Sequence, residues 1–190
     1  MPLRHHAGAR LLLAAATLAV ASVLVVRSTA GAQPASSATR VDSLPLQPTR
    51  SLRFTADEGT WMSLDVAPDG RSIVFDLLGD LYSLPIGGGK AARLTSGTAF
   101  DAQPRWSPDG RSVVYVSDRS GADNVWIADA DGRNARAITR DTHHNFVSPE
   151  WTPDGAFVVV SRSTEEINRP QDYQLFLYHR SGTGSGVQLT

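Results

Sequence analysis

Short apolar runs bounded by Gly, Pro, Asp and Ser follow one another from residue 51 to residue 190. In each of three successive segments, one run begins just after a Pro-Asp-Gly triplet, at residues 73–75, 113–116 and 157–160. A second run follows in each segment, at residues 81–84, 125–128 and 175–178. The runs have the length of strands, and none continues with the 3.6-residue period of a helix. The pattern therefore predicts an all-β region over residues 51–190.

The strands belong to an internal repeat that is anchored on the three triplets. These are Pro68-Asp69-Gly70, Pro108-Asp109-Gly110 and Pro153-Asp154-Gly155. Proline presets φ at the second position of a type I turn, and glycine suits the fourth, so each triplet predicts a tight turn between two strands. Each segment closes on an apolar residue followed by a threonine, at Thr95, Thr139 and Thr190.

The spacing within the repeat shows which part of it is variable. From the triplet glycine to the second apolar run the gaps are 11, 15 and 20 residues, whereas from that run to the closing threonine they are 14, 14 and 15. Nearly all the length variation therefore lies in one loop per repeat. Four short antiparallel strands with a period of 40 to 45 residues are typical of a β-propeller blade. A β-sandwich is the alternative, but sandwiches do not usually repeat a turn motif at a fixed period.

We place three blades at residues 61–95, 102–139 and 147–190. Residues 51–55 precede them, and Arg53-Phe54-Thr55 is similar to Arg93-Leu94-Thr95. We interpret 51–55 as an orphan closing strand, which would complete the outer edge of a last blade that these residues do not contain. Closed rings have about four to eight blades, so we expect a partial β-propeller whose open blade faces make it associate with itself.

The first 50 residues have a different character. Arg4 and Arg10 precede an apolar run from Leu11 to Val26, and a small-residue cleavage site follows at 30–32. Residues 1–32 therefore predict a signal peptide in a helix, with an uncleaved membrane anchor as the alternative. Residues 33–50 are rich in Pro, Ser and Thr and are interpreted as a flexible linker. We expect export to the periplasm or the extracellular space, with membrane contact only through an uncleaved signal segment.

Composition excludes several classes of function. The formal net charge is −1, and the region beyond the signal segment is slightly acidic, which argues against nucleic acid as a partner. The chain contains no cysteine, which excludes disulfides, thiolate metal sites and a cysteine nucleophile. His143 and His144 are adjacent with no third ligand evident nearby, so a solvated loop is favoured over a metal site. The sequence thus predicts no metal, no cofactor and no catalytic residue in this chain.

The repeat resembles that of TolB-like β-propellers, a Pro-Asp-Gly relative of the WD-type repeat. The resemblance is carried by 106–111 (Trp-Ser-Pro-Asp-Gly-Arg), 117–119 (Ser-Asp-Arg), 129–132 (Asp-Ala-Asp-Gly) and 138–139 (Ile-Thr). A narrower resemblance, carried by residues 54–66 and 75–82, is to the start of large exported proteins that combine such a propeller with a metal-dependent amidohydrolase domain. That family implies a His-x-His metal motif in a (β/α)₈ barrel, and the present 190 residues contain no His-x-His.

These resemblances lead to three hypotheses about function. In the first, the chain is the non-catalytic N-terminal binding domain of a larger secreted amidohydrolase-like hydrolase, with any catalytic domain beyond Thr190. In the second, it is a periplasmic protein–protein interaction scaffold of the TolB type. In the third, it is part of the propeller lid of a serine peptidase. The expected partners are the remaining blades and a downstream domain of the same protein, or another periplasmic protein.

The surface for a partner is predicted from the variable loops. Functional residues are often carried by loops on a rigid scaffold, and in each blade the second turn and the blade-to-blade connection emerge on the same face. That face holds residues 117–124 and 162–172, together with the connections 96–103 and 140–148. Its candidate partner-binding residues are Asp118, Arg119, Asp123, Asn124, His143, His144, Arg162, Glu165, Glu166 and Arg169. We expect alanine at Arg119, Arg162 and Arg169 to weaken docking without changing stability, and we expect Trp106 and Trp151 to pack between blades.

Overall fold

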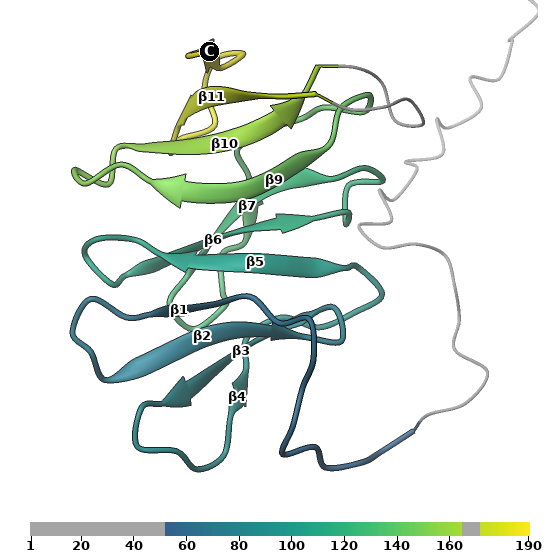
Figure 1. Ribbon diagram of the computed structural model, residues 1–190, viewed down its shortest axis with the longest axis vertical. Coiled ribbons are helices and arrows are strands. Elements are labelled where there is room, and N and C mark those ends of the chain that lie inside the picture. The colour runs from purple at the N-terminus through teal and green to yellow at the C-terminus, as the bar shows by residue number, and fades with distance from the viewer. Residues whose placement is uncertain (1–51, 165–171) are drawn as a thin grey trace, which may run out of the picture. The chain divides into compact units, whose positions relative to one another are not determined.

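The computed structural model describes residues 52–164 and 172–190. These residues form three four-stranded antiparallel sheets (Figure 1), which confirms the all-β, partial-propeller prediction. Within them there is no helix, and hence none that could cross a membrane. The predicted signal peptide (1–32) and linker (33–50) lie outside the described residues.

Each sheet takes its strands in sequence order, so neighbouring strands are joined by hairpins. Blade 1 contains β1 (Leu64–Val66), β2 (Ser72–Leu77), β3 (Asp80–Pro85) and β4 (Ala92–Arg93). Blade 2 contains β5 (Asp101–Trp106), β6 (Ser112–Ser117), β7 (Asn124–Asp129) and β8 (Arg136–Ala137). Blade 3 contains β9 (Phe146–Trp151), β10 (Phe157–Ser163), β11 (Tyr173–His179) and β12 (Val187–Gln188). Residues 52–55 belong to none of these sheets.

The three Pro-Asp-Gly triplets form the turns between the first and second strands of each blade. The N–H of Gly110 donates to the carbonyl of Ser107 at 2.8 Å, and the same bond joins Gly70 to Ala67 and Gly155 to Thr152. The three glycines have φ of 69°, 66° and 66°, in the left-handed region that glycine adopts without strain. The triplet aspartates also accept a hydrogen bond from the N–H two residues later, at 3.0 Å in each repeat.

The closing threonines have a shared structural role. The hydroxyl oxygens of Thr95 and Thr139 accept hydrogen bonds at 2.9 Å from the N–H groups of Leu81 and Val125, each the second residue of the third strand of its blade. Thr190 accepts the equivalent bond from Leu175 at 3.0 Å. A threonine at this position therefore satisfies a third-strand N–H beyond the end of the short outer strand.

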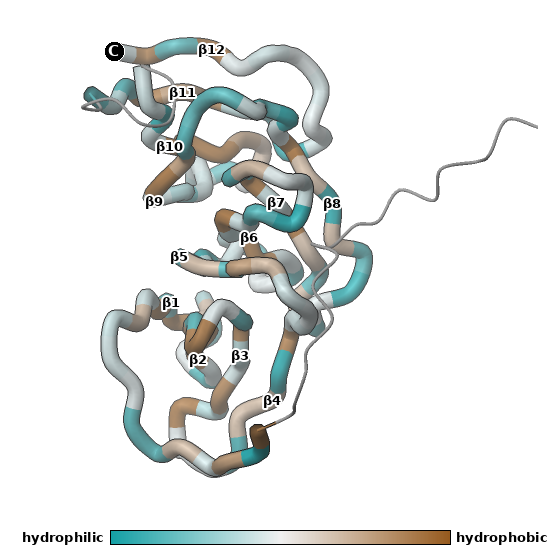
Figure 2. The backbone as a smooth tube through the Cα atoms, turned by 90° about the vertical axis from the view of Figure 1, so that its right-hand side faces the viewer, coloured by the Kyte–Doolittle hydropathy of each residue, from teal (hydrophilic) through white to brown (hydrophobic). Residues whose placement is uncertain are grey.

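Two hydrophobic clusters join the blades. Trp106 packs with Val74 and Leu81 of blade 1 and with Tyr115 of blade 2. Trp151 packs with Val114 and Ile138 of blade 2 and with Val158 of blade 3. Both tryptophans are buried, which confirms the prediction that they pack between blades. Figure 2 shows the stack from the side, with the inner strands β1, β5 and β9 along one edge and β4 and β8 along the other.

Candidate partner-binding surface

The second turns and the blade-to-blade connections emerge opposite the Pro-Asp-Gly turns, because all the strands are antiparallel. We call this surface the loop face. Among the described residues, it comprises 78–79, 118–123, Thr164 and Asp172 in the second turns, and residues 94–100 and 138–145 in the connections. Of the predicted site residues, Glu165, Glu166 and Arg169 lie outside the described residues.

Arg119 is part of the fold rather than a free group on the loop face. Its Nη2 atom is 2.6 Å from Oδ2 of Asp101, whose side chain is only 1% exposed. The guanidinium also lies over the rings of Tyr115 and Trp126, at 5.7 and 5.2 Å from their centroids. An ion pair that covers a buried carboxylate is costly to break from one side. Contrary to the expectation from the sequence, we therefore expect alanine at Arg119 to lower stability.

Asn124 is also unavailable to a partner, since it is only 1% exposed. Its Oδ1 accepts hydrogen bonds at 2.8 Å from the N–H of Asp141 and the hydroxyl of Thr139. Its Nδ2 donates to the carbonyl of Asp141 at 2.9 Å. Asn124 thus ties the third strand of blade 2 to the connection that leads into blade 3.

Asp141 organises the histidine pair in that connection. Its carboxylate accepts from the N–H groups of His143 and His144, at 2.8 and 3.1 Å, and lies 2.9 Å from Nδ1 of His144. Burial alone would raise the pKa of Asp141, but these hydrogen bonds outweigh burial and lower the pKa. No group of three potential metal ligands occurs in the part of the chain that the structure describes.

Arg162 completes the cluster from β10. Its Nη2 atom lies 3.4 Å from Oδ2 of Asp141 and 3.0 Å from Nδ1 of His144. The guanidinium also stacks on Phe176, at 4.8 Å from the ring centroid. Arg162 joins blade 3 to the preceding connection, so we expect its removal to lower stability as well. His143 is exposed and keeps its ring available at the surface.

The two candidate aspartates of the second turn in blade 2 differ in environment. Asp118 accepts a hydrogen bond at 2.8 Å from the N–H of Phe100, in the connection that enters blade 2. Burial, together with the nearby charge of Asp118, raises the pKa of Asp123 above its ordinary value. The charged form of Asp123 is therefore disfavoured in the fold, as expected for a carboxyl near a like charge.

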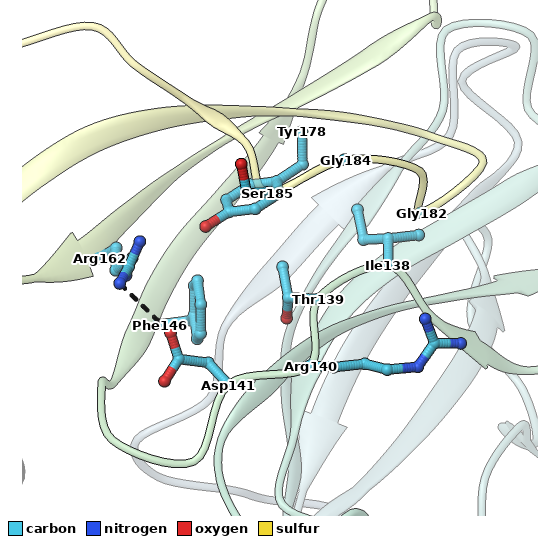
Figure 3. A pocket seen from close by; sticks show the side chains of 10 residues that line it. All are labelled: Ile138, Thr139, Arg140, Asp141, Phe146, Arg162, Tyr178, Gly182, Gly184 and Ser185. Atoms are coloured by element: carbon cyan, nitrogen blue, oxygen red, sulfur yellow. Dashed lines mark ion pairs between the residues drawn. The ribbon is translucent and has the colours of Figure 1, made fainter.

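A cavity of about 270 Å³ lies between blades 2 and 3, beside the Asp141 cluster (Figure 3). Its polar lining comes from Thr139, Arg140 and Asp141 on one side and Arg162, Tyr178 and Ser185 on the other. Ile138 and Phe146 supply its apolar wall. The lining contains no histidine or cysteine, and it offers hydrogen-bonding groups of both charges rather than a nucleophile paired with a base.

Two exposed apolar side chains of the loop face were not predicted. Leu78 and Phe100 are large and mainly exposed, and Phe100 lies against Gly79 at the tip of the β2–β3 turn. Their exposure could have been predicted from the sequence, because both are large apolar residues in segments that are predicted to be loops. Asp101 and Asp141, which hold the two arginines, were also missed. The position of Asp101 is taken by Phe146 in the next repeat, so the repeat itself carries no trace of the ion pair.

Three four-stranded antiparallel sheets that pack on one another through equivalent residues are β-propeller blades. Residues 67–187 match the Tricorn protease N-terminal β-propeller domain family, and the chain belongs to that family. The TolB-like resemblance is supported by the solved structure of a putative TolB from Agrobacterium tumefaciens. That structure is 30% identical, with a TM-score of 0.58, over 66% of this chain and 47% of its own.

Sequence relatives are longer than the present chain. An uncharacterised protein of Agrobacterium fabrum is 31% identical over 127 residues, which are 64% of this chain and 43% of the relative. The uncharacterised peptidase YuxL of Bacillus subtilis is 30% identical over 118 residues, which are 55% of this chain and 18% of the relative. The chain therefore spans less than half the length of either protein.

Proposed function

We propose that this propeller region is the non-catalytic N-terminal binding domain of a larger exported hydrolase of the amidohydrolase type. The role of an accessory domain is supported by the family match to a propeller domain and by relatives that extend well beyond the matched region. The amidohydrolase type is supported by the sequence resemblance of residues 54–66 and 75–82. In this role the propeller binds or screens substrates, and the chemistry belongs to another domain. We propose export to the periplasm or the extracellular space, to be tested by cell fractionation.

A peptidase is the second candidate for the parent protein. It is favoured by the family's printed description and by the name of the Bacillus subtilis relative. In that case the propeller would serve as a lid that restricts access to a serine nucleophile. A scaffold without hydrolytic activity is the third possibility, and the structural likeness to a putative TolB supports it.

One experiment on the full natural protein separates these functions. The protein is incubated with N-acyl amino acids and with a blocked peptide, with and without a chelator and with a fluorophosphonate. We expect hydrolysis that the chelator abolishes and added Zn²⁺ or Mn²⁺ restores. Hydrolysis that survives the chelator but is lost with the fluorophosphonate would identify the peptidase instead. Absence of hydrolysis under all conditions would support the third candidate, a scaffold without hydrolytic activity.

The docking role of the loop face is tested in the same protein. Phe100→Ser removes an exposed side chain from this face, and we expect it to weaken substrate screening while the turnover of a small substrate is unchanged. Arg133→Ala is the control, since Arg133 is exposed and lies in the hairpin between β7 and β8 on the opposite face. Equal behaviour of the two variants would remove the loop face from the proposal.

A further inference from the structure

The cavity between blades 2 and 3 is closed on one side by the last hairpin of blade 3, residues 180–186 (Figure 3). At Gly182 this hairpin packs on the end of β8, since an added Cβ would lie 3.1 Å from Cα of Ile138. At Gly186 it packs on the ring of Tyr178, with an added Cβ only 2.5 Å from Cε1. All the lining residues belong to blades 2 and 3 and their connection, so the cavity does not depend on what adjoins the outer blade faces.

Four large side chains of the lining have small counterparts at the junction between blades 1 and 2. The counterparts follow from the strand registers and from the distances to the triplet glycines and the closing threonines. They are Ser96 for Arg140, Gly97 for Asp141, Ser117 for Arg162 and Ala128 for Tyr178. Blades therefore pack without these four side chains, and their presence at one junction indicates a role beyond the packing that both junctions share.

The hydrogen-bonding groups of the lining differ in whether they already have partners. Asp141 and Arg162 face each other at 3.4 Å, so their charges offset one another. The hydroxyl of Thr139 both donates and accepts a hydrogen bond within blade 2. The exposed guanidinium of Arg140 and the exposed hydroxyl of Ser185 have no partner among the residues that the structure describes. One unpaired positive charge and one free hydroxyl therefore remain beside the apolar wall of the cavity.

We propose that this cavity binds a small carboxylic acid that carries a short aliphatic or aromatic group. The single unpaired guanidinium of Arg140 matches a monoanion, and a hydrogen bond between a guanidinium and a carboxylate is strong because both groups are charged. A phosphate dianion would keep one negative charge uncompensated. Ile138 and Phe146 provide an apolar wall for the rest of the ligand. The volume of about 270 Å³ leaves room for such a molecule in place of several waters, since a water occupies about 30 Å³ in the liquid.

The test measures the binding of 3-phenylpropionate to the full natural protein by ligand-observed NMR. This acid has no amide bond, so a hydrolase cannot consume it, and the result is independent of the proposed function. We expect saturable binding, no binding of the neutral 3-phenylpropionamide, and at least ten-fold weaker binding of acetate, which lacks the apolar group. Equal affinity for the acid and its amide, equal affinity for acetate, or no binding at all would overturn the proposal.

Two variants test whether the acid binds in the cavity. Arg140→Gln removes the unpaired charge, and Ser185→Trp fills the space beneath the hairpin. Both side chains are exposed, so each variant should keep the far-UV circular dichroism of the parent, and we expect each to bind 3-phenylpropionate at least ten-fold more weakly. Arg133→Gln is the matched control for the loss of one positive charge on an exposed hairpin, and it should bind like the parent. Equal binding by both variants and the control would show that the acid binds elsewhere, and the proposal would be wrong.

The end of a peptide is the other source of a carboxylate beside an apolar group. The same titration with a short peptide that ends in phenylalanine, with chelator and fluorophosphonate present to prevent hydrolysis, separates the two sources. We expect the peptide to bind more weakly than 3-phenylpropionate, because most of it would have to lie outside the cavity. Tighter binding of the peptide that both variants abolish would assign the cavity to peptide ends and overturn its assignment to a free acid.

Discussion

Arginine side chains on the loop face show that a polar residue in a variable loop can stabilise the fold. Removal of Arg119 leaves the carboxylate of Asp101 buried without its 2.6 Å partner. We expect Arg119→Ala to lower the free energy of unfolding by about 2–4 kcal/mol, because an uncompensated buried charge is costly. Urea denaturation followed by tryptophan fluorescence measures the change.

Arg133→Ala provides the matched control for this prediction. Arg133 pairs with Asp131 at 3.5 Å, and both side chains are largely exposed. Exposed pairs contribute little, so we expect a change within about 0.5 kcal/mol. Similar losses for the two variants would contradict the structural role of Arg119.

Replacement of Asp123 should raise stability, whereas replacement of Arg119 should lower it. Burial and the neighbouring Asp118 raise its folded pKa above the ordinary aspartate value. A carboxyl with a raised folded pKa destabilises the fold where it is ionised, above that pKa, and this penalty disappears below the unfolded pKa of about 3.9. We therefore expect Asp123→Asn to raise the melting temperature at pH 7, with the gain vanishing as the pH falls below 4.

The pH series decides between two reasons for such a gain. A gain in melting temperature that persists unchanged at pH 3.5 would show that the charge of Asp123 is not its cause. Asp118→Ala is the companion variant. It removes the acceptor for the N–H of Phe100, so it should not reproduce the gain.

At the scale of single elements, the third hairpin of blade 2 is tightly constrained. Gly132 has φ of 84°, and an added Cβ would collide with the backbone of Leu94 in the preceding blade. We expect Gly132→Ala to cost about 3 kcal/mol, from left-handed backbone strain together with overpacking. Gly121→Ala separates the two causes, since Gly121 has φ of 96° with open space around it. That control should cost about 1–2 kcal/mol, and equal losses would contradict the close blade contact.

The elements themselves could be predicted from local chemistry. Proline, aspartate and glycine in the triplets determine a turn within a few residues, and the apolar runs beside them determine strands. The ion pair between Arg119 and Asp101 could not be predicted, because it depends on a side chain that has no counterpart in the other repeats. Asn124 was misjudged for a related reason: a polar residue at the end of a loop can be buried when a connection from elsewhere folds over it.

At the scale of the whole molecule, the account depends on three blades that are related by the same rotation. The repeat predicts this arrangement from spacing alone, since only one loop per blade changes in length. How many blades complete the ring cannot be obtained from local patterns, because it depends on the angle between neighbouring blades.

Distances between equivalent turns test the radial repeat most directly. The chain has no cysteine, so Arg71→Cys, Arg111→Cys and Ala156→Cys can be combined in pairs and spin-labelled without background. Double electron–electron resonance then measures the three distances between spin labels. An excess of unlabelled protein ensures that these distances are within one chain. The account predicts nearly equal 71–111 and 111–156 distances, and a 71–156 distance that exceeds either but is shorter than their sum. A 71–156 distance no longer than the other two, or widely unequal neighbouring distances, would contradict it.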